Sequence, residues 1–373
     1  MGDCRQLSMA SPECFHVLGR TNGERMPLTL FWTASGFEVN YNGTELWCDF
    51  VTDYTSFEQW IAVEVNGAVI ARQMLPKGES HICLCRNMQT KKENTIRVFK
   101  EVQAMPGDEK ALLQVVGLFG DGELLPVKEK TYRLEFVGDS ITSGEGSYGA
   151  QGEPDWIAQW FSTTNTYPYL TAQSLNAEYR VVSQSGYGLL TAWDNNRDNN
   201  IPAYYEQVCG VLAGERNLEL GAKKPYDFSK WQPDAVIINL GTNDAGAFDQ
   251  PAWTDPRTGK VFKMERDAQG KPLDSCLLAV TDAAREFLFT VRKNNPNAQI
   301  LWCLGIMGSL TSEAVTAGIN KYCEASGDKK AAFLPLAEMT KEQVGARFHP
   351  GLLGHRAAAD EVTKKLSELL NKE

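Results

Sequence analysis

The chain has 373 residues, of which 43% are hydrophobic and 23% are charged, and this composition predicts a packed globular protein rather than a disordered one. Its formal net charge of −10 argues against nucleic acid and anionic membrane surfaces as partners. No run approaches the roughly 20 apolar residues that span a bilayer, and the first residues lack an apolar secretory segment, so we expect a cytoplasmic protein, or a secreted one whose leader has been removed.

The first part of the chain, up to about residue 128, has the texture of β-structure. Short runs rich in β-branched and aromatic residues alternate with turn signals, and they include LTLFW, TELWCDF, WIAVEVNG and NTIRVFKEV. Asn66-Gly67, within AVEVNGAVIAR, is the strongest short hairpin signal. About eight such runs predict a β-sandwich domain, jelly-roll-like, over residues 1–128.

From residue 131 to residue 373, strand-like and helix-like runs alternate. The predicted strands are 133–137, 179–183, 234–240, 299–304 and 331–335. The predicted helices are 167–176, 275–294, 312–325 and 352–370. Such alternation predicts a three-layer α/β/α domain with a parallel sheet, in which ligands bind beyond the carboxyl ends of the strands.

The segment LEFVGDSITSGEGSYG, residues 134–149, permits two interpretations. Ser140 follows an apolar strand in a Gly-Asp-Ser turn, where a nucleophile could stand. Gly144, Gly146 and Gly149 instead have the G-x-G-x-x-G spacing of a dinucleotide-binding turn. That turn needs its glycines directly between strand and helix, whereas GDSITS intervenes here and the next strand ends in Ser-Gln-Ser without an acid. We therefore favour the nucleophile and expect no cofactor.

Two further motifs follow later predicted strands. Gly186 lies in VVSQSGYGLL, and a glycine lets the backbone turn its N–H toward a substrate without a Cβ in the way. Asn243 lies in AVIINLGTNDAGAF, where its amide N–H could face a developing oxyanion. Each residue could equally belong to an ordinary turn.

A serine nucleophile needs a base, and the chain has only four histidines. His16 and His81 lie in the β-rich part, and His355 falls inside the last predicted helix. His349 precedes a proline in the loop that leads into that helix, from which its side chain could reach back over the sheet. Elimination therefore selects His349.

Together the four motifs resemble those of the SGNH, or GDSL-type, hydrolase superfamily, whose Ser, Gly, Asn and His fall in this order after successive strands. The matching residues are Ser140 in GDSIT, Gly186 in SQSGYG, Asn243 in GTND and His349 in FHPGLLGH. A β-sandwich ahead of this domain, with HPxxxGH at the end, is similar to carbohydrate esterase family two. That resemblance implies an enzyme that removes O-acetyl groups from plant-derived oligo- or polysaccharides of the mannan or xylan type, with no metal.

The resemblance also implies the mechanism. Ser140 attacks the ester carbonyl while His349 takes its proton. The backbone N–H groups of Ser140 and Gly186, with the side chain of Asn243, bind the oxyanion. The departing sugar hydroxyl then takes the proton from His349, and water releases acetate.

One position departs from the superfamily pattern. An Asp usually stands three residues before the His, and here that position is Ala346. Because the family resembled includes members in which a backbone carbonyl beside the His does this work, we predict a Ser–His dyad with the Phe348 carbonyl orienting the imidazole. If Glu338, Glu342 or Asp360 completed a triad instead, its change to the amide would cost roughly a thousandfold in activity.

Aromatic side chains near these motifs are candidates for sugar binding, because sugars pack their C–H groups on aromatic faces. Tyr187 and Trp253 are the preferred candidates, with Trp160 and the polar Asp139 beside them. Trp156, Phe161 and Trp193 also lie nearby, and core packing is an equally good interpretation for each aromatic residue. The alternative functions are a lipase or thioesterase of the same superfamily and a non-catalytic carbohydrate-binding protein.

Overall fold

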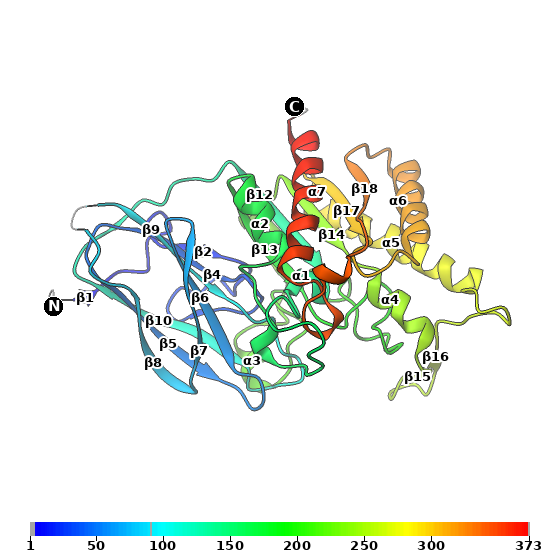
Figure 1. The fold of residues 1–373 in the computed structure, drawn as a ribbon, viewed down its shortest axis with the longest axis horizontal. Coiled ribbons are helices and arrows are strands. Elements are labelled where there is room, and N and C mark those ends of the chain that lie inside the picture. Colours follow the sequence, from blue (N-terminus) through cyan, green and yellow to red (C-terminus); the bar gives the residue numbers. More distant parts are fainter. Residues whose placement is uncertain (1–3, 90–91, 372–373) are drawn as a thin grey trace.

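Residues 5–125 form two antiparallel sheets that pack face to face as a sandwich, the smaller of two unequal halves of the structure; the second and larger half is residues 132–370 (Figure 1). This computed structural model describes residues 4–89 and 92–371. One sheet has the order β1-β10-β5-β8, with β3 paired to β10, and the other has the order β11-β4-β9-β6-β7, with β2 paired to β4. The strands are β1 (Arg5–Gln6), β2 (His16–Leu18), β3 (Leu28–Thr29), β4 (Gly36–Tyr41), β5 (Leu46–Asp53), β6 (Gln59–Val65), β7 (Ala68–Leu75), β8 (Gly78–Cys85), β9 (Asn94–Lys100), β10 (Leu112–Gly120) and β11 (Leu124–Leu125).

The sandwich follows from alternation in the sequence. In β5 every second residue is fully buried, because successive side chains of a strand point to opposite faces of the sheet. Strands β6 and β7 pair with Val65 opposite Ala68, so Asn66 and Gly67 form a two-residue turn. Both turn residues have positive φ, 52° and 85°, as a type I′ hairpin requires. The predicted hairpin is therefore confirmed.

The second half contains a five-stranded parallel sheet with the order β13-β12-β14-β17-β18. Its strands are β12 (Tyr132–Gly138), β13 (Ala177–Ser183), β14 (Ala235–Asn239), β17 (Gln299–Leu304) and β18 (Ala331–Pro335), and a small hairpin adds β15 (Trp253–Thr254) and β16 (Val261–Phe262). The helices are α1 (Ser140–Ser143), α2 (Tyr167–Ser174), α3 (Glu215–Glu219), α4 (Thr242–Gly246), α5 (Asp274–Asn294), α6 (Ser312–Ser326) and α7 (Leu352–Leu370). All the predicted strands and helices of this half are present, with ends displaced by two residues at most.

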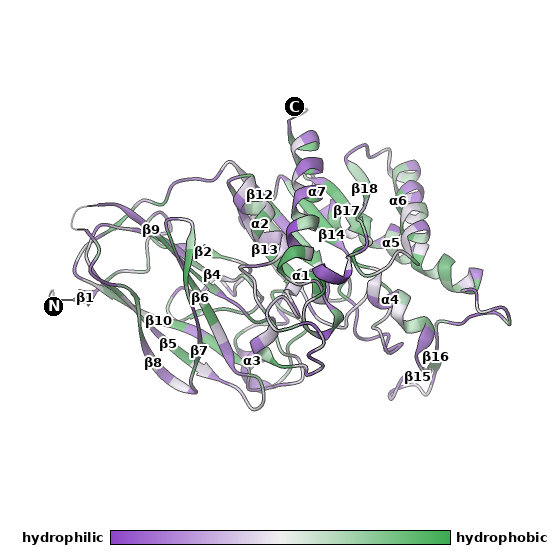
Figure 2. Ribbon diagram, viewed as in Figure 1, coloured by the Kyte–Doolittle hydropathy of each residue, from purple (hydrophilic) through white to green (hydrophobic). Residues whose placement is uncertain are grey.

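Helices cover both faces of the parallel sheet. Buried residues of α2 and α7 pack on one face, and those of α5 and α6 pack on the other. Strands β14 and β17 are mostly hydrophobic in Figure 2, as expected of strands buried on both faces. The predicted fold class, a β-sandwich followed by a three-layer α/β/α domain, is confirmed.

The two halves share buried side chains rather than meeting only at a linker. Phe31 and Trp32 of the sandwich half belong to the core on the α5 and α6 face, and the Trp32 indole N–H donates to Val208 O at 2.7 Å. Arg20 is fully buried between the halves and pairs with Glu135 of β12 at 2.8 Å. The predicted boundary at residues 128–131 falls between β11 and β12. Within the described residues, no helix combines the length and the apolar character that crossing a membrane requires.

Candidate active site

Ser140 stands at the point where β12 ends and α1 begins. Asp139 caps the helix, with its carboxylate accepting the Ile141 N–H at 3.0 Å. The tight turn requires glycine before the cap, because a Cβ on Gly138 would lie 2.0 Å from Thr142 Oγ1. This short strand–turn–helix connection places the serine at the carboxyl end of the sheet.

His349 lies directly opposite the serine, in the loop before α7. Its Nε2 is 2.8 Å from Ser140 Oγ, and its Nδ1 is 2.8 Å from the carbonyl oxygen of Arg347. The predicted acceptor, the Phe348 carbonyl, is therefore wrong by one residue. Arg347 and Phe348 both have φ of +58°, and this left-handed turn aims the Arg347 carbonyl at the ring while the Phe348 side chain is 71% exposed.

Asn243 and Gly186 complete the cluster of predicted residues. Asn243 lies in the first turn of α4, and its Nδ2 donates to Tyr187 O at 2.9 Å and faces Asp139 Oδ2 at 3.2 Å. Gly186 follows β13 with φ of +80°, a conformation that favours glycine. The structure thus brings Ser140, Gly186, Asn243 and His349 to one pocket of about 410 Å³.

Two buried carboxylates, Asp244 and Asp139, hold the loops that carry these four residues. Asp244 accepts the N–H groups of residues 189–191 at 2.7–3.0 Å and so fixes the loop that follows Gly186. Burial raises the pKa of Asp244. Burial, with the neighbouring charges of Asp244 and Glu145, also raises the pKa of Asp139 to about 7. Asp244 was not among the predicted site residues, although it is the last residue of the GTND motif.

The aromatic residues that line the pocket differ from the preferred candidates. The lining residues are Ser140, Glu145, Trp156, Ser185, Gly186, Trp193, Asn243, Arg347 and His349. Trp156 and Trp193 were the weaker candidates, and Trp193 is 50% exposed. Neither tryptophan lies in a strand or helix, so no periodic pattern marks its direction.

The four predicted substrate-binding residues lie outside this lining, which corrects those predictions. Tyr187 is buried in the core beside Tyr204, with ring centroids 6.1 Å apart. Trp160 packs against Gly149, and Trp253 lies on the β15–β16 hairpin. Asp139 is fully buried and is used by the helix cap.

The sandwich half supports the pocket without lining it. Phe57 packs edge-on against Trp156, with ring centroids 4.9 Å apart. Gln103 Oε1 accepts the N–H of Ser185 at 2.8 Å, next to Gly186. All the lining residues lie after residue 131, in the α/β domain, so the sandwich supports the pocket from outside.

The glycine-rich segment after Ser140 is packed rather than loose. A Cβ on Gly144 would lie 1.9 Å from Ser162 O, and one on Gly146 would lie 2.2 Å from Ala346 O and 2.8 Å from His349 Cβ. Gly146 therefore allows the nucleophile's loop to approach the histidine's turn closely, and Gly144 allows it to pack on Ser162. The spacing that imitates a dinucleotide motif has this steric origin.

Gly146→Ala is expected to lower kcat/KM for an ester by about a hundredfold, because the added methyl displaces the turn that carries His349. Gly152→Ala is the matched control, since Gly152 also has positive φ, +91°, but a Cβ there meets nothing within 4 Å. Steady-state kinetics and melting temperatures of both variants give the comparison. Equal activities for the two would contradict the steric argument.

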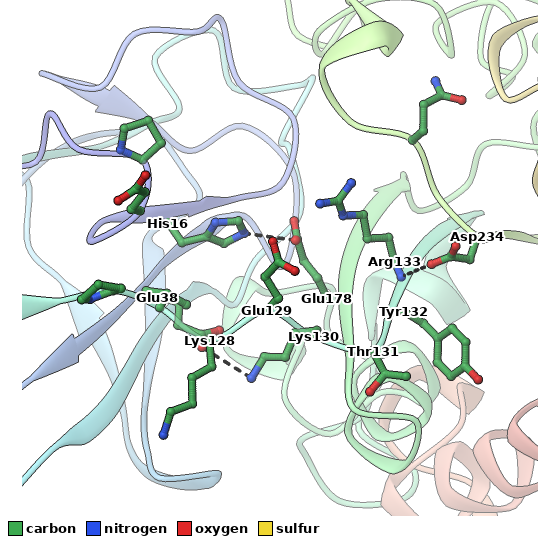
Figure 3. A pocket seen from close by; sticks show the side chains of 15 residues that line it. His16, Glu38, Lys128, Glu129, Lys130, Thr131, Tyr132, Arg133, Glu178 and Asp234 are labelled. Carbon is green, nitrogen blue, oxygen red and sulfur yellow. Dashed lines mark hydrogen bonds and ion pairs between the residues drawn. The ribbon is translucent and has the colours of Figure 1, made fainter.

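A larger pocket of about 610 Å³ lies between the two halves, at the amino ends of β12 and β13 (Figure 3). Two ion pairs lie within it: His16 Nε2 is 3.1 Å from Glu178 Oε2, and Lys130 Nζ is 3.4 Å from Glu38 Oε1. Ser140 lies at the opposite, carboxyl end of the sheet. This pocket therefore takes no part in the serine–histidine geometry.

Comparison with known proteins places this geometry in a family. The sequence model of the GDSL-like Lipase/Acylhydrolase family matches residues 136–357, which is more than half of the chain. The structure of an acetyl xylan esterase, Est2A, from the rumen bacterium Butyrivibrio proteoclasticus is 45% identical, with a TM-score of 0.96, and the match covers 99% of this chain and 98% of that one.

Two further relatives are more distant. A family two carbohydrate esterase from Clostridium thermocellum, solved with cellohexaose, has the same fold at 24% identity and a TM-score of 0.77, over 95% of this chain and 99% of that one. An acetylxylan esterase / glucomannan deacetylase from Cellvibrio japonicus is 26% identical over 258 residues, 64% of this chain and 57% of the relative. The chain spans 37% to 62% of the length of the curated relatives that it matches. The resemblance predicted from the four motifs is confirmed, and the chain belongs to the GDSL-like lipase/acylhydrolase family.

Proposed function

We propose that this protein is a carboxylic ester hydrolase that removes O-acetyl groups from plant-derived oligo- or polysaccharides of the xylan or mannan type. The observation that carries the proposal is the 2.8 Å contact between Ser140 Oγ and His349 Nε2, made while Nδ1 is held by a backbone carbonyl. The names of the relatives, an acetyl xylan esterase and a glucomannan deacetylase, support the substrate class.

The hydrogen bonds of His349 suit it to act as the base. Because Nδ1 faces the Arg347 carbonyl, it carries the proton, and Nε2 is left with a lone pair toward Ser140. As Ser140 Oγ bonds to the acetyl carbon, its proton passes to Nε2. The imidazolium then protonates the departing sugar oxygen, and a water molecule deprotonated by the same nitrogen cleaves the acetyl-enzyme to acetate.

The oxyanion of each tetrahedral intermediate needs donors near the serine. The Ser140 N–H belongs to the first turn of α1, where backbone N–H groups have no partner within the helix. Gly186 and Asn243 line the same pocket. Asn243 Nδ2 donates one N–H to Tyr187 O at 2.9 Å and the other to Asp139 Oδ2 at 3.2 Å, and the longer bond is the one that the oxyanion would share.

Acetate release tests the proposal. We expect release from p-nitrophenyl acetate, and from a panel of acetylated xylan and mannan oligosaccharides followed by NMR, which identifies the glycan and the hydroxyl. A lipase or thioesterase would prefer butyryl or longer esters, whereas a carbohydrate deacetylase should strongly prefer acetyl. A wild-type protein that binds the oligosaccharides but releases no acetate would be a non-catalytic binding protein.

Trp193→Ala is expected to raise KM for acetylated oligosaccharides by about threefold to tenfold, because the half-exposed ring at the pocket rim supplies an apolar face to a sugar. The KM for p-nitrophenyl acetate should change less, since this small ester has no sugar to lie on the ring. Trp47→Ala, on β5 of the sandwich, is the control for loss of a tryptophan elsewhere. An oligosaccharide KM that is unchanged in Trp193→Ala would refute a platform role.

A further inference from the structure

Glu145 places a carboxylate beside the proposed base. The residue follows α1, between Gly144 and Gly146, and its side chain is only 4% exposed. Its Oε1 lies 3.8 Å from His349 Nδ1. Its own backbone N–H donates to Ser140 O at 3.0 Å. One residue of the nucleophile's loop therefore adjoins both members of the dyad.

The same carboxylate also holds the residue that orients the histidine. Arg347 Nε lies 3.3 Å from Glu145 Oε1, and Arg347 Nη1 donates to Pro154 O at 2.9 Å. The backbone N–H of Arg347 donates to Glu153 O at 2.8 Å. These three contacts fix Arg347 in its left-handed conformation, with the carbonyl oxygen aimed at the histidine ring.

We propose that Glu145 is a positioning residue that supplies, from the nucleophile's own loop, the negative charge that the histidine's loop lacks at Ala346. It acts in two ways: it anchors Arg347 and hence the carbonyl that orients His349, and its charge stabilises the imidazolium that forms when His349 takes the Ser140 proton. The inference rests on the proposed ester hydrolysis and explains how the chemistry proceeds without the usual Asp.

The charges around His349 set the direction of the effect. Ser140 faces the ring from α1, Arg347 from its own turn, and Glu145 from the glycine-rich segment. His355 lies behind it on α7, where burial and the nearby His349 lower its pKa to about 3, so it is neutral. The Arg347 guanidinium also pairs with Glu145, at 3.3 Å, and among the described residues Glu145 is the one acid with a carboxylate oxygen within 4 Å of a His349 ring nitrogen.

Glu145→Gln tests the proposal, because glutamine keeps the shape and an acceptor for Arg347 Nε while it removes the charge. We expect kcat for p-nitrophenyl acetate to fall about tenfold with KM unchanged, and the acidic limb of the kcat/KM profile to move to lower pH. Without the carboxylate, His349 binds a proton less readily, so it remains unprotonated in more acidic solution but is a weaker base. A purely structural role would not move this limb.

Arg347→Met should move the acidic limb in the opposite direction, which makes it a second test of the charge effect. It removes the positive charge, so the acidic limb should move to higher pH. Because the variant also loses two of the three contacts that fix the turn and keeps only the backbone bond to Glu153 O, the direction of the limb shift is the readout, not kcat. Glu342→Gln is the matched control, since the Glu342 carboxylate accepts from Thr340 Oγ1 at 2.7 Å on the exposed 3₁₀ turn 341–343. Its kinetics should equal those of the wild type.

Two results would overturn the proposal. One is a Glu145→Gln variant with wild-type kcat and an unmoved limb. The other is a variant whose kcat falls together with its melting temperature while the limb stays in place. Absence of acetate release by the wild type would count against the proposed function instead, so the two failures are distinguishable.

Discussion

Ser140→Ala is expected to lower kcat/KM for p-nitrophenyl acetate by roughly 10⁴- to 10⁶-fold, the largest single effect in the chain. Its hydroxyl already has an imidazole base in hydrogen-bond range, at 2.8 Å from His349 Nε2. The variant should bind acetylated oligosaccharide as well as the wild type does, because the ligand surface and the buried cap at Asp139 are unchanged. Kinetics and calorimetric titration of the inactive variant measure the two quantities separately.

Ser174→Ala is a suitable control, because its exposed hydroxyl donates to Leu170 O on α2 and lies outside the pocket. The sharper competitor is Ser185, which lines the pocket and whose buried Oγ has no hydrogen-bond partner. If Ser140→Ala retained most of the activity and Ser185→Ala lost it, the assignment of the nucleophile would be wrong. The structure disfavours that outcome, since the histidine faces Ser140.

The positions that were predictable from sequence are those where chain order and elimination leave few options. With four histidines in the chain, exclusion of the β-rich half and of the last helix left His349, and the structure places it against Ser140. The ends of the strands could also be predicted, because buried parallel strands appear in the sequence as nearly continuous apolar runs, such as 235–239. Once the strands are known to be parallel, no further information is needed to predict that their carboxyl ends lie at the same edge of the sheet.

The predictions that were wrong or missing depend on local backbone geometry, which the residue types do not indicate. The acceptor for His349 moved from Phe348 to Arg347 because two consecutive non-glycine residues adopt positive φ, a conformation that neither arginine nor phenylalanine favours. Glu145 was not predicted, because the spacing of its neighbours Gly144 and Gly146 is the more conspicuous pattern and hides the acid between them. The sequence did contain a signal for Glu145. An acid between two glycines that pack closely on their surroundings is itself held close to the residues that those glycines contact.

The sugar-binding candidates failed for a related reason. Tyr187 adjoins Gly186 in sequence, yet the tyrosine side chain lies in the core while Gly186 lines the pocket. Trp193 lies at the pocket although it is seven residues further along the chain, because its backbone N–H donates to Gly186 O at 3.2 Å. Proximity in sequence to a site residue thus selects the right loop but not the side of the loop that a given residue occupies.

Asn243→Ala is expected to lower kcat by roughly 10²- to 10³-fold with little change in KM, the cost typical of losing one oxyanion donor. We expect kcat to fall without a change in KM because the oxyanion forms in the transition state and is absent from the bound ester. Asn243 is preorganised as a donor, because α4 fixes its backbone and the Tyr187 carbonyl at 2.9 Å fixes one of its two N–H groups. Single-turnover kinetics on p-nitrophenyl acetate isolate the acylation step.

Asn243→Asp separates donor loss from simple loss of volume. The aspartate keeps the size of the side chain but has no N–H, and its charge would face both the oxyanion and the buried Asp139, which the asparagine now approaches at 3.2 Å. We therefore expect the aspartate variant to be at least as slow as the alanine variant. If both variants kept wild-type kcat, the Ser140 and Gly186 N–H groups would suffice for the oxyanion. Asn243 would then serve only to hold the Tyr187 loop, and its loss would appear in the melting temperature rather than in the rate.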